Sequence, residues 1–242
     1  MTGSSSGGGS NSSGSSSGGP SGSGSSGGSS GSSSSGGSSG GTDASIAAAY
    51  PSGPYCTPAG SAGHMDVGCV LPNMTWIGYD DEAANEVATK EPYATYTLDD
   101  ARKSGKRYAM INVAEFDCPG CQNSATELGA TNDAGVSAGA SVVQAGGLVI
   151  EVLETSGFVA IASMTDLESW VNKYSLMVTT VKDPDSSSGT PTLDQFGRRD
   201  QAYIVDLTTM KILQYIDGSI VATAGGNSAG LAMTAMHTLL GK

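Results

Sequence analysis

The chain has 242 residues, a formal net charge of −12 and a sequence pI near 4.3. No basic run occurs, and the densest patch of Lys and Arg, residues 102–107, lies in a predicted turn. The composition therefore argues against a nucleic-acid partner, which would need a positive footprint. No apolar run reaches the roughly 18 residues of a membrane-spanning helix, so the sequence predicts no transmembrane segment.

The N-terminal region is of low complexity. Residues 3–41 are almost purely Ser and Gly, interrupted only by Asn11 and Pro20. Such a segment buries no apolar surface that could offset the entropy of ordering, so residues 1–42 are predicted to form a disordered tether. A Pro/Gly-rich extension is expected over residues 43–69, and one compact domain over residues 70–242.

Two of the four cysteines, Cys56 and Cys69, lie in this extension. The simplest interpretation is a structural disulfide, which would close a loop of about a dozen residues and contribute roughly 3 kcal/mol. Such a disulfide would indicate an oxidising compartment. In the alternative, one of these cysteines resolves Cys118, a role for which Cys121 is already available.

The hydrophobic pattern from residue 74 onward predicts alternating strands and helices. The predicted strands are residues 74–77, 108–114, 148–153, 176–181, 202–206 and 211–216. The predicted helices are residues 97–102, 122–128, 137–144, 166–174 and 228–240, with Thr97 and Thr165 as N-caps of two of them. Residues 80–86 and 183–200 are predicted loops. This order predicts an α/β fold, a central mixed sheet with helices on both faces.

The motif Cys118-Pro119-Gly120-Cys121 lies between a predicted buried strand and a predicted helix. Free N–H groups at a helix start stabilise a thiolate, and the thiolate is the nucleophile of disulfide exchange. Cys121, one turn later, could close on Cys118 and release the bound partner. A Cys-x-x-Cys motif can also form half of a zinc site, but this position between strand and helix favours redox chemistry.

Residues 108–121 resemble the segment around the dithiol in the TlpA/ResA-like branch of the thioredoxin superfamily, which typically reads "vvNFWAtWCxPC". Asn112 coincides with the Asn of that pattern. Residues 97–106 are similar to the family's "tLsdlrGK" lead-in, residues 202–206 to its "ptxfliD" strand, and residues 70–73 to its "aPdf" opening. The Ser/Gly tether and the approach segment resemble redoxin-type lipoproteins of myxobacteria.

The resemblance implies a thioredoxin-like fold that exchanges thiols and disulfides with partner proteins without a cofactor. Cys118 and Cys121 would be catalytic, with Pro119 between them, and Glu115 would shuttle protons for Cys121 or be a plain polar residue at the strand end. The implied location is the periplasm or cell envelope, with a lipid anchor upstream of the tether. Met1 and Thr2 stand where the lipid-bearing Cys would lie, so the tether could also be an expression linker or follow a misassigned start.

Three positions depart from the family pattern. Asp117 replaces the Trp before the first cysteine, and a neighbouring anion predicts a raised pKa for Cys118 and hence a reductase direction. Asp200 stands where the family has a cis-proline opposite the dithiol, which puts thioredoxin-like exchange in doubt. Ser124 replaces a Glu that many relatives carry three positions after the second cysteine.

Two other functions compete with exchange. Peroxiredoxins resemble "PxxxTxxC" at the reacting cysteine, but Ile111 and Glu115 occupy the Pro and Thr positions here. Arg198 or Arg199 lies near the place where those enzymes hold an Arg, which favours a peroxidase. The third possibility is a thioredoxin fold that serves only as a binding or structural module. Neither histidine has metal-ligand spacing, so the sequence predicts no metal site.

Overall fold

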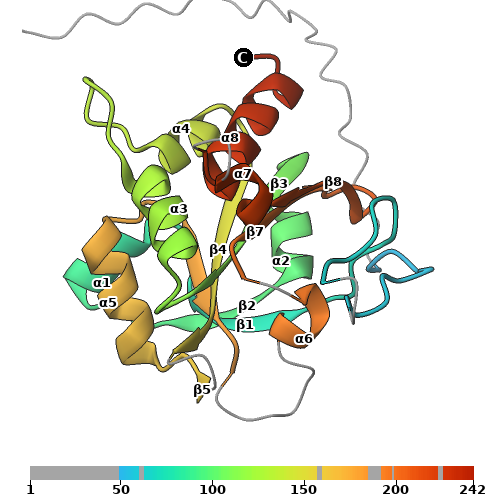
Figure 1. The fold of residues 1–242 in the computed structure, drawn as a ribbon, viewed down its shortest axis with the longest axis horizontal. Coiled ribbons are helices and arrows are strands. Elements are labelled where there is room, and N and C mark those ends of the chain that lie inside the picture. The colour runs from blue at the N-terminus through green and yellow to red at the C-terminus, as the bar shows by residue number, and fades with distance from the viewer. Residues whose placement is uncertain (1–48, 60–62, 157–159, 185–191, 198, 223–225) are drawn as a thin grey trace, which may run out of the picture. The chain divides into compact units, whose positions relative to one another are not determined.

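A mixed sheet forms the centre of the computed structural model, which describes residues 49–59, 63–156, 160–184, 192–197, 199–222 and 226–242 (Figure 1). The predicted tether over residues 1–42 lies outside these ranges. All elements described below belong to the unit from Thr42 to Lys242.

The sheet has eight strands in the order β2-β1-β6-β4-β3-β7-β8, with β5 paired to β4. Strands β3, β4 and β6 are parallel to one another, whereas β1, β2, β7 and β8 are antiparallel to their neighbours. Strand β3 is central and buried along its whole length, as its nearly continuous apolar sequence requires. The strands are β1 Thr75–Tyr79, β2 Ala94–Thr97, β3 Tyr108–Glu115, β4 Leu148–Ser156, β5 Ala160–Ile161, β6 Thr179–Lys182, β7 Gln201–Asp206 and β8 Lys211–Asp217.

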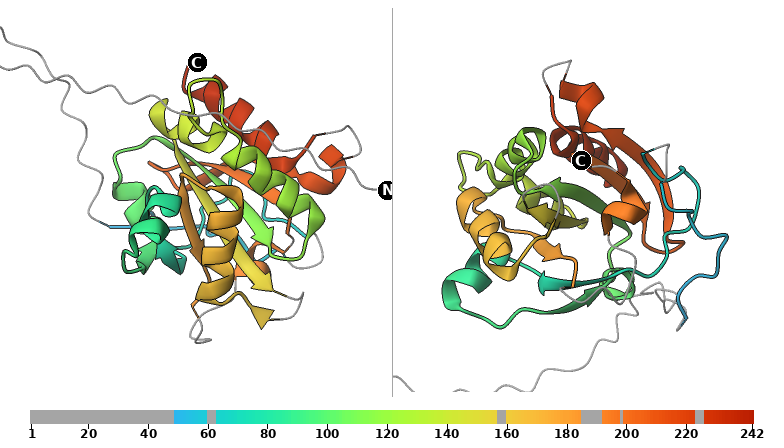
Figure 2. Two further views of the ribbon diagram at one scale, coloured as in Figure 1. Left: turned by 90° about the vertical axis from the view of Figure 1, so that its left-hand side faces the viewer. Right: turned by 60° about the horizontal axis from the view of Figure 1, so that its bottom comes forward.

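Two hydrophobic cores cover the two faces of the sheet, because successive side chains of each strand point to opposite faces. We call them the helical face and the extension face. On the helical face, Met110 and Ala114 of β3 pack with side chains of α1, α3, α4, α5 and α8. On the extension face, Ile111 and Val113 pack with α2, α6 and the segment before β1 (Figures 1 and 2). The helices are α1 Ala83–Thr89, α2 Leu98–Lys103, α3 Pro119–Gly129, α4 Ala138–Gln144, α5 Met164–Tyr174, α6 Thr192–Phe196, α7 Gly218–Ala222 and α8 Ser228–Leu239.

This arrangement is the thioredoxin-like fold that the sequence predicted. The dithiol follows the central strand, that strand is parallel to β4, and the β7–β8 hairpin lies on its other side. Helix α8 follows the hairpin and packs on the helical face. The expected α/β class, with helices on both faces of a mixed sheet, is confirmed.

Three local predictions were wrong. Residues 80–86 are not all loop, because α1 begins at Ala83. Helix α6 lies within the stretch predicted as loop from residue 183 to residue 200. The N-cap of α5 is Ser163 rather than Thr165: the Ser163 hydroxyl accepts a hydrogen bond from Asp166 N at 3.1 Å, and the Asp166 carboxylate accepts one from Ser163 N at 2.8 Å.

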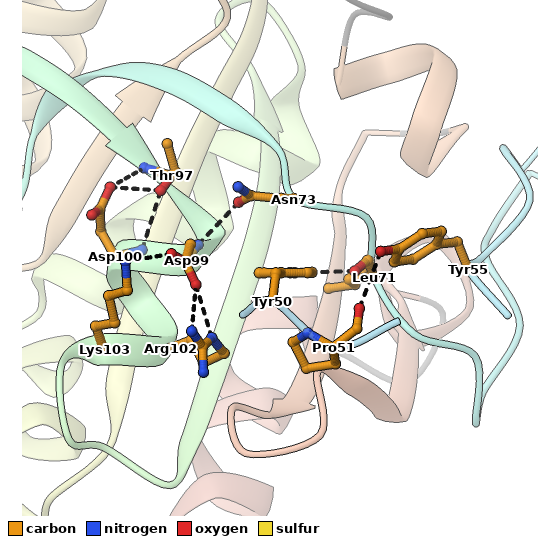
Figure 3. A network of polar contacts seen from close by, with 10 residues as sticks. All are labelled: Tyr50, Pro51, Tyr55, Leu71, Asn73, Thr97, Asp99, Asp100, Arg102 and Lys103. Atoms are coloured by element: carbon orange, nitrogen blue, oxygen red, sulfur yellow. Dashed lines mark hydrogen bonds and ion pairs between the residues drawn. The ribbon is translucent and has the colours of Figure 1, made fainter. Parts of the chain in front are cut away.

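The start of α2 shows how short helices are fixed beside the sheet (Figure 3). The Thr97 hydroxyl accepts a hydrogen bond from Asp100 N at 3.1 Å, and the Asp100 carboxylate accepts one from Thr97 N at 2.8 Å. Asp99 accepts from both Arg102 and Lys103 further along the helix, with nitrogen–oxygen distances of 2.8 and 2.5 Å. Because it is paired in this way, the buried Arg102 side chain can lie against the extension face.

The segment before β1 is fastened to the extension face. A disulfide joins Cys56 and Cys69, the pairing that the loop spacing predicts. The Tyr50 hydroxyl donates a hydrogen bond to Leu71 O at 3.0 Å (Figure 3). Cys56 and Leu71 are both buried in the core of this face. The segment is therefore part of the folded unit rather than a loose approach to it.

Candidate active site

Helix α3 begins at the dithiol. Cys118 is its N-cap, with extended backbone, and its sulfur accepts a hydrogen bond from Cys121 N at 3.2 Å. Pro119 occupies the first helical position, where a missing N–H costs nothing because that group has no partner within the helix. Both cysteines are free thiols, Cys118 with 7% and Cys121 with 0% of its surface exposed. Of the two side chains, only that of Cys118 therefore reaches the protein surface.

The two thiols differ strongly in acidity. A hydrogen bond from the Cys121 thiol, assisted by the Cys121 N–H and the charge of Arg199, lowers the pKa of Cys118 to about 7, against the opposing effects of burial and Asp200. Burial, followed by its hydrogen bond to Cys118, raises the pKa of Cys121 far above its ordinary value. Cys118 is therefore the more acidic thiol of the pair, and Cys121 is by far the less acidic one.

The prediction that Asp117 raises the pKa of Cys118 was wrong. The Asp117 side chain is exposed, so water screens its charge. The donors on Cys118 act at hydrogen-bond distance in a buried position and determine the direction. The charge opposing them comes from Asp200, which lies far along the chain from the dithiol.

Asp200 lies in the turn before β7, where the family carries its cis-proline. Its φ of 54° is in the left-handed region, and both of its backbone groups are bonded: Asp200 N donates to Val113 O at 2.9 Å, and Gly218 N donates to Asp200 O at 2.8 Å. Its Oδ1 accepts hydrogen bonds from the hydroxyls of Ser124 at 3.2 Å and Ser228 at 3.1 Å. These four hydrogen bonds leave Asp200 little freedom.

The other carboxylate oxygen of Asp200 lies against the turn between the two cysteines. A Cβ atom placed on Gly120 would approach Asp200 Oδ2 to 2.1 Å, well inside any real contact distance. Gly120 is therefore required because the carboxylate occupies the space that a side chain would need. The sequence identified Asp200 only as a missing proline, and nothing in the sequence pointed to its serine partners on α3 and α8.

A chain of buried polar side chains continues from this point into the helical face. The Ser228 hydroxyl shares its one proton between Asp200 Oδ1 and Asn112 Oδ1, which lies at 3.2 Å, and Asn112 Nδ2 donates to Glu151 Oε2 at 2.7 Å. Trp170 Nε1 donates to the second oxygen of Glu151 at 3.1 Å. Complete burial raises the pKa of Glu151 to about 8, although both hydrogen bonds favour its ionised form.

Glu115 ends β3, shortly before Cys118. Its buried carboxylate forms an ion pair with Arg199 through Oε2. Arg199 is the residue whose positive charge lowers the pKa of Cys118. The role predicted for Glu115, a proton shuttle for Cys121, stays a prediction. Arg198 lies outside the described residues.

Within the part of the chain that the structure describes, no three His, Cys, Asp or Glu side chains lie close enough together to hold a metal ion. In the same part of the chain, no helix has the length and apolar character needed to cross a membrane.

No protein-family model matches the sequence, and no curated protein matches it. Several solved structures are similar. A thiol:disulfide interchange protein from Bacteroides sp. has 13% identity and a TM-score of 0.43, covering 73% of this chain and 91% of its own. A putative thiol:disulfide interchange protein DsbE from Chlorobium tepidum has 15% identity and a TM-score of 0.41, covering 69% and 98%.

The reduced 2-Cys peroxiredoxin of Plasmodium vivax has 11% identity and a TM-score of 0.45, covering 72% of this chain and 81% of its own.

Proposed function

We propose that this protein catalyses thiol–disulfide exchange with partner proteins, with Cys118 as the attacking and Cys121 as the resolving cysteine. The observation that carries the proposal is the position of Cys118 at the start of α3, with its sulfur bonded by Cys121 N. With a pKa of about 7, about half of Cys118 is thiolate at neutral pH.

The reaction has two steps. The Cys118 thiolate attacks one sulfur of a partner disulfide, so that a mixed disulfide forms and the other partner sulfur leaves as thiolate. Cys121 then loses its proton and attacks Cys118 Sγ, which releases the second partner thiolate. The dithiol is oxidised by two electrons and the partner is reduced by two. Pro119 fixes the first residue of α3, and Glu115 holds Arg199 near the attacking sulfur.

We propose the reductase direction, for a reason different from the one the sequence suggested. Stabilising the thiolate stabilises the reduced pair, and a strong oxidant such as DsbA has a nucleophile pKa of about 3.5. Cys118, at about 7, resembles the nucleophile of thioredoxin, whose potential is about −270 mV. A reduction potential below about −250 mV would support this direction.

Trapping of the mixed disulfide tests the exchange reaction. The variant Cys121→Ser should accumulate a covalent adduct with a disulfide-bonded test protein, found by mass spectrometry at Cys118. Cys118→Ser is the matched control and should form none, because Cys121 is buried and its pKa is raised. If Cys121→Ser forms no adduct with any of a panel of disulfide proteins, the exchange proposal is wrong.

Peroxide reduction is the second candidate, and the charge of Arg199 at Cys118 is the observation in its favour. Glu115 stands where the peroxidase pattern has a hydroxyl, and its carboxylate is bound to that same Arg199. Treatment with hydrogen peroxide separates the two: a peroxidase would convert Cys118 to sulfenic acid far faster than a free thiol of the same pKa reacts.

We further propose an extracytoplasmic location, in the periplasm or cell envelope. The Cys56–Cys69 disulfide supports it, since such bonds persist in oxidising compartments. The Ser/Gly tether would then hold the domain away from a lipid anchor upstream, as in the lipoproteins that the sequence resembles. Fractionation of cells that produce the natural gene product, with and without inhibition of lipoprotein processing, tests both points.

A further inference from the structure

In the resolving step, the Cys121 thiol must lose its proton before its sulfur can attack Cys118. Cys121 is completely buried, and its pKa lies far above its ordinary value. If resolution depended on spontaneous ionisation of Cys121, the thiolate would form rarely and the mixed disulfide would be long-lived. A group beside the dithiol that accepts the proton removes this obstacle, which is how a positioned base accelerates a reaction.

Asp200 has the position for this task. Its carboxylate lies against Gly120, between the two cysteines, and its charge acts on both thiols. Oδ1 is held by the hydroxyls of Ser124 and Ser228. The serines thus fix one oxygen and leave Oδ2 on the side of the dithiol.

The other carboxyl groups near the dithiol are less suitable. The carboxylate of Glu115 forms an ion pair with Arg199, and a proton placed there would be repelled by the guanidinium. Both oxygens of Glu151 accept hydrogen bonds, from Asn112 and Trp170, and Asn112 separates it from the hydroxyls around Asp200. Among the described residues, the charge of Asp200 acts on the two cysteines and on Glu151, and Arg199 precedes it in the chain.

We propose that the carboxylate of Asp200 accepts the proton of Cys121 Sγ as Cys121 attacks the mixed disulfide at Cys118. The Cys121–Cys118 sulfur bond forms, the bond from Cys118 to the partner breaks, and the partner leaves as a thiolate. Asp200 then returns the proton to that thiolate or to water. This inference rests on the proposed exchange function, and it assigns a role to the residue that replaces the family's cis-proline.

Single-turnover kinetics with the aromatic disulfide 5,5′-dithiobis(2-nitrobenzoate) separate the two steps. The first coloured thiolate is released when Cys118 attacks, and the second when Cys121 resolves. In Asp200→Asn the second release should slow by about 100-fold, whereas the first should be unchanged or faster, because Asp200 raises the pKa of Cys118. A variant that merely disturbed the structure would slow both releases, rather than the second release alone.

Asp133→Asn is the matched control: it removes a charge from the exposed loop after α3 and should resolve at the wild-type rate. Glu115→Gln tests the competing base, because it removes the carboxylate that holds Arg199. It should slow the second release far less than Asp200→Asn does. The inference is overturned if Asp200→Asn resolves at the wild-type rate, or if Glu115→Gln slows resolution equally.

Failure of the underlying function gives a different result. If the wild-type protein releases no thiolate at all, thiol–disulfide exchange itself is wrong and the role of Asp200 falls with it. Circular dichroism establishes whether Asp200→Asn is folded. If it is not, Asp200→Ser is measured instead: slow resolution with normal attack supports the inference, and normal resolution overturns it.

Discussion

The two faces of the sheet each hold one pair of cysteines, and only one of the two pairs is bonded as a disulfide. On the extension face, Cys56 and Cys69 are joined in a disulfide. On the helical face, Cys118 and Cys121 remain free thiols. Cys56, Cys118 and Cys121 are all buried, so burial alone does not distinguish a structural pair from a reactive one.

The neighbours make the difference. Beside the disulfide the contacts are backbone hydrogen bonds, such as Cys56 N to Val70 O at 2.7 Å, and apolar side chains. Beside the dithiol lie a helix N-terminus and the charged groups Arg199 and Asp200. The second environment can stabilise a thiolate and move a proton, and the first can do neither. What separates the pairs is the set of ionisable groups around them.

Removal of the disulfide should give the largest change in stability. We expect Cys56→Ala/Cys69→Ala to lower the free energy of unfolding by about 3 kcal/mol, because the bridge closes a loop with a sequence separation of 13. Urea unfolding measures this effect. The rate of exchange at Cys118 should stay within about twofold, since substitutions that distant usually act independently.

The matched control is Cys118→Ala/Cys121→Ala, which should abolish exchange and leave stability much closer to that of the wild-type protein, as no covalent bond is lost. A disulfide-free variant that keeps its stability but loses exchange would reverse the assignment of the two pairs.

The sequence predicted the fold well because buried strands and capped helices leave local signals. The apolar run of β3 and the hairpin β7–β8 lie within a residue of their predicted ends. The short helices α1 and α6 were missed, since the acidic and polar residues that begin them are equally typical of loops. A five-residue helix is determined by what it packs against, which the local sequence does not show.

The site was predicted only as far as the motif extends. Cys118 and Cys121 are recognisable from their spacing, whereas Asp200 and its partners Ser124 and Ser228 come from three different parts of the chain. Ser124 and Ser228 look like ordinary helix residues until the fold places their hydroxyls on one carboxylate. The acidity of Cys118 was predicted with the wrong sign for the same reason: the sequence shows adjacent charges, but not which of them are exposed.

Glu151 offers the next test, because it should make the helical face sensitive to pH. Its pKa is raised from 4.5 to about 8 by burial, so between these values the folded protein keeps a proton that the unfolded chain has lost. The free energy of unfolding therefore falls as pH rises through this window, by up to about 1.4 kcal/mol per pH unit. Glu151→Gln should remove this component of the pH dependence.

Urea unfolding between pH 6 and pH 7 measures the effect, and Glu127→Gln serves as control because that carboxylate is exposed on α3. The control should follow the wild-type slope. If Glu151→Gln also follows it, Glu151 is ionised in the folded protein and the polar chain from Asn112 holds a buried charge.

The smallest expected effect concerns Arg199, whose charge helps to lower the pKa of Cys118. We expect Arg199→Gln to raise that pKa and to reduce the rate of Cys118 alkylation by iodoacetamide at pH 7 about two- to threefold. The change is small because the Arg199 side chain is 45% exposed, so water screens its charge.

The same variant leaves Glu115 buried without its cation, and this separates two contributions to the rate. At pH 9 the Cys118 thiol is already ionised, so Arg199→Gln and the wild-type protein should react equally fast if Arg199 acts only through the pKa. Glu115→Gln keeps Arg199 but removes its ion-pair partner. At pH 7 its rate of alkylation should lie between those of the wild-type protein and Arg199→Gln. A tenfold loss that persists at pH 9 would instead mean that Arg199 shapes access to Cys118, and the electrostatic explanation of its reactivity would be wrong.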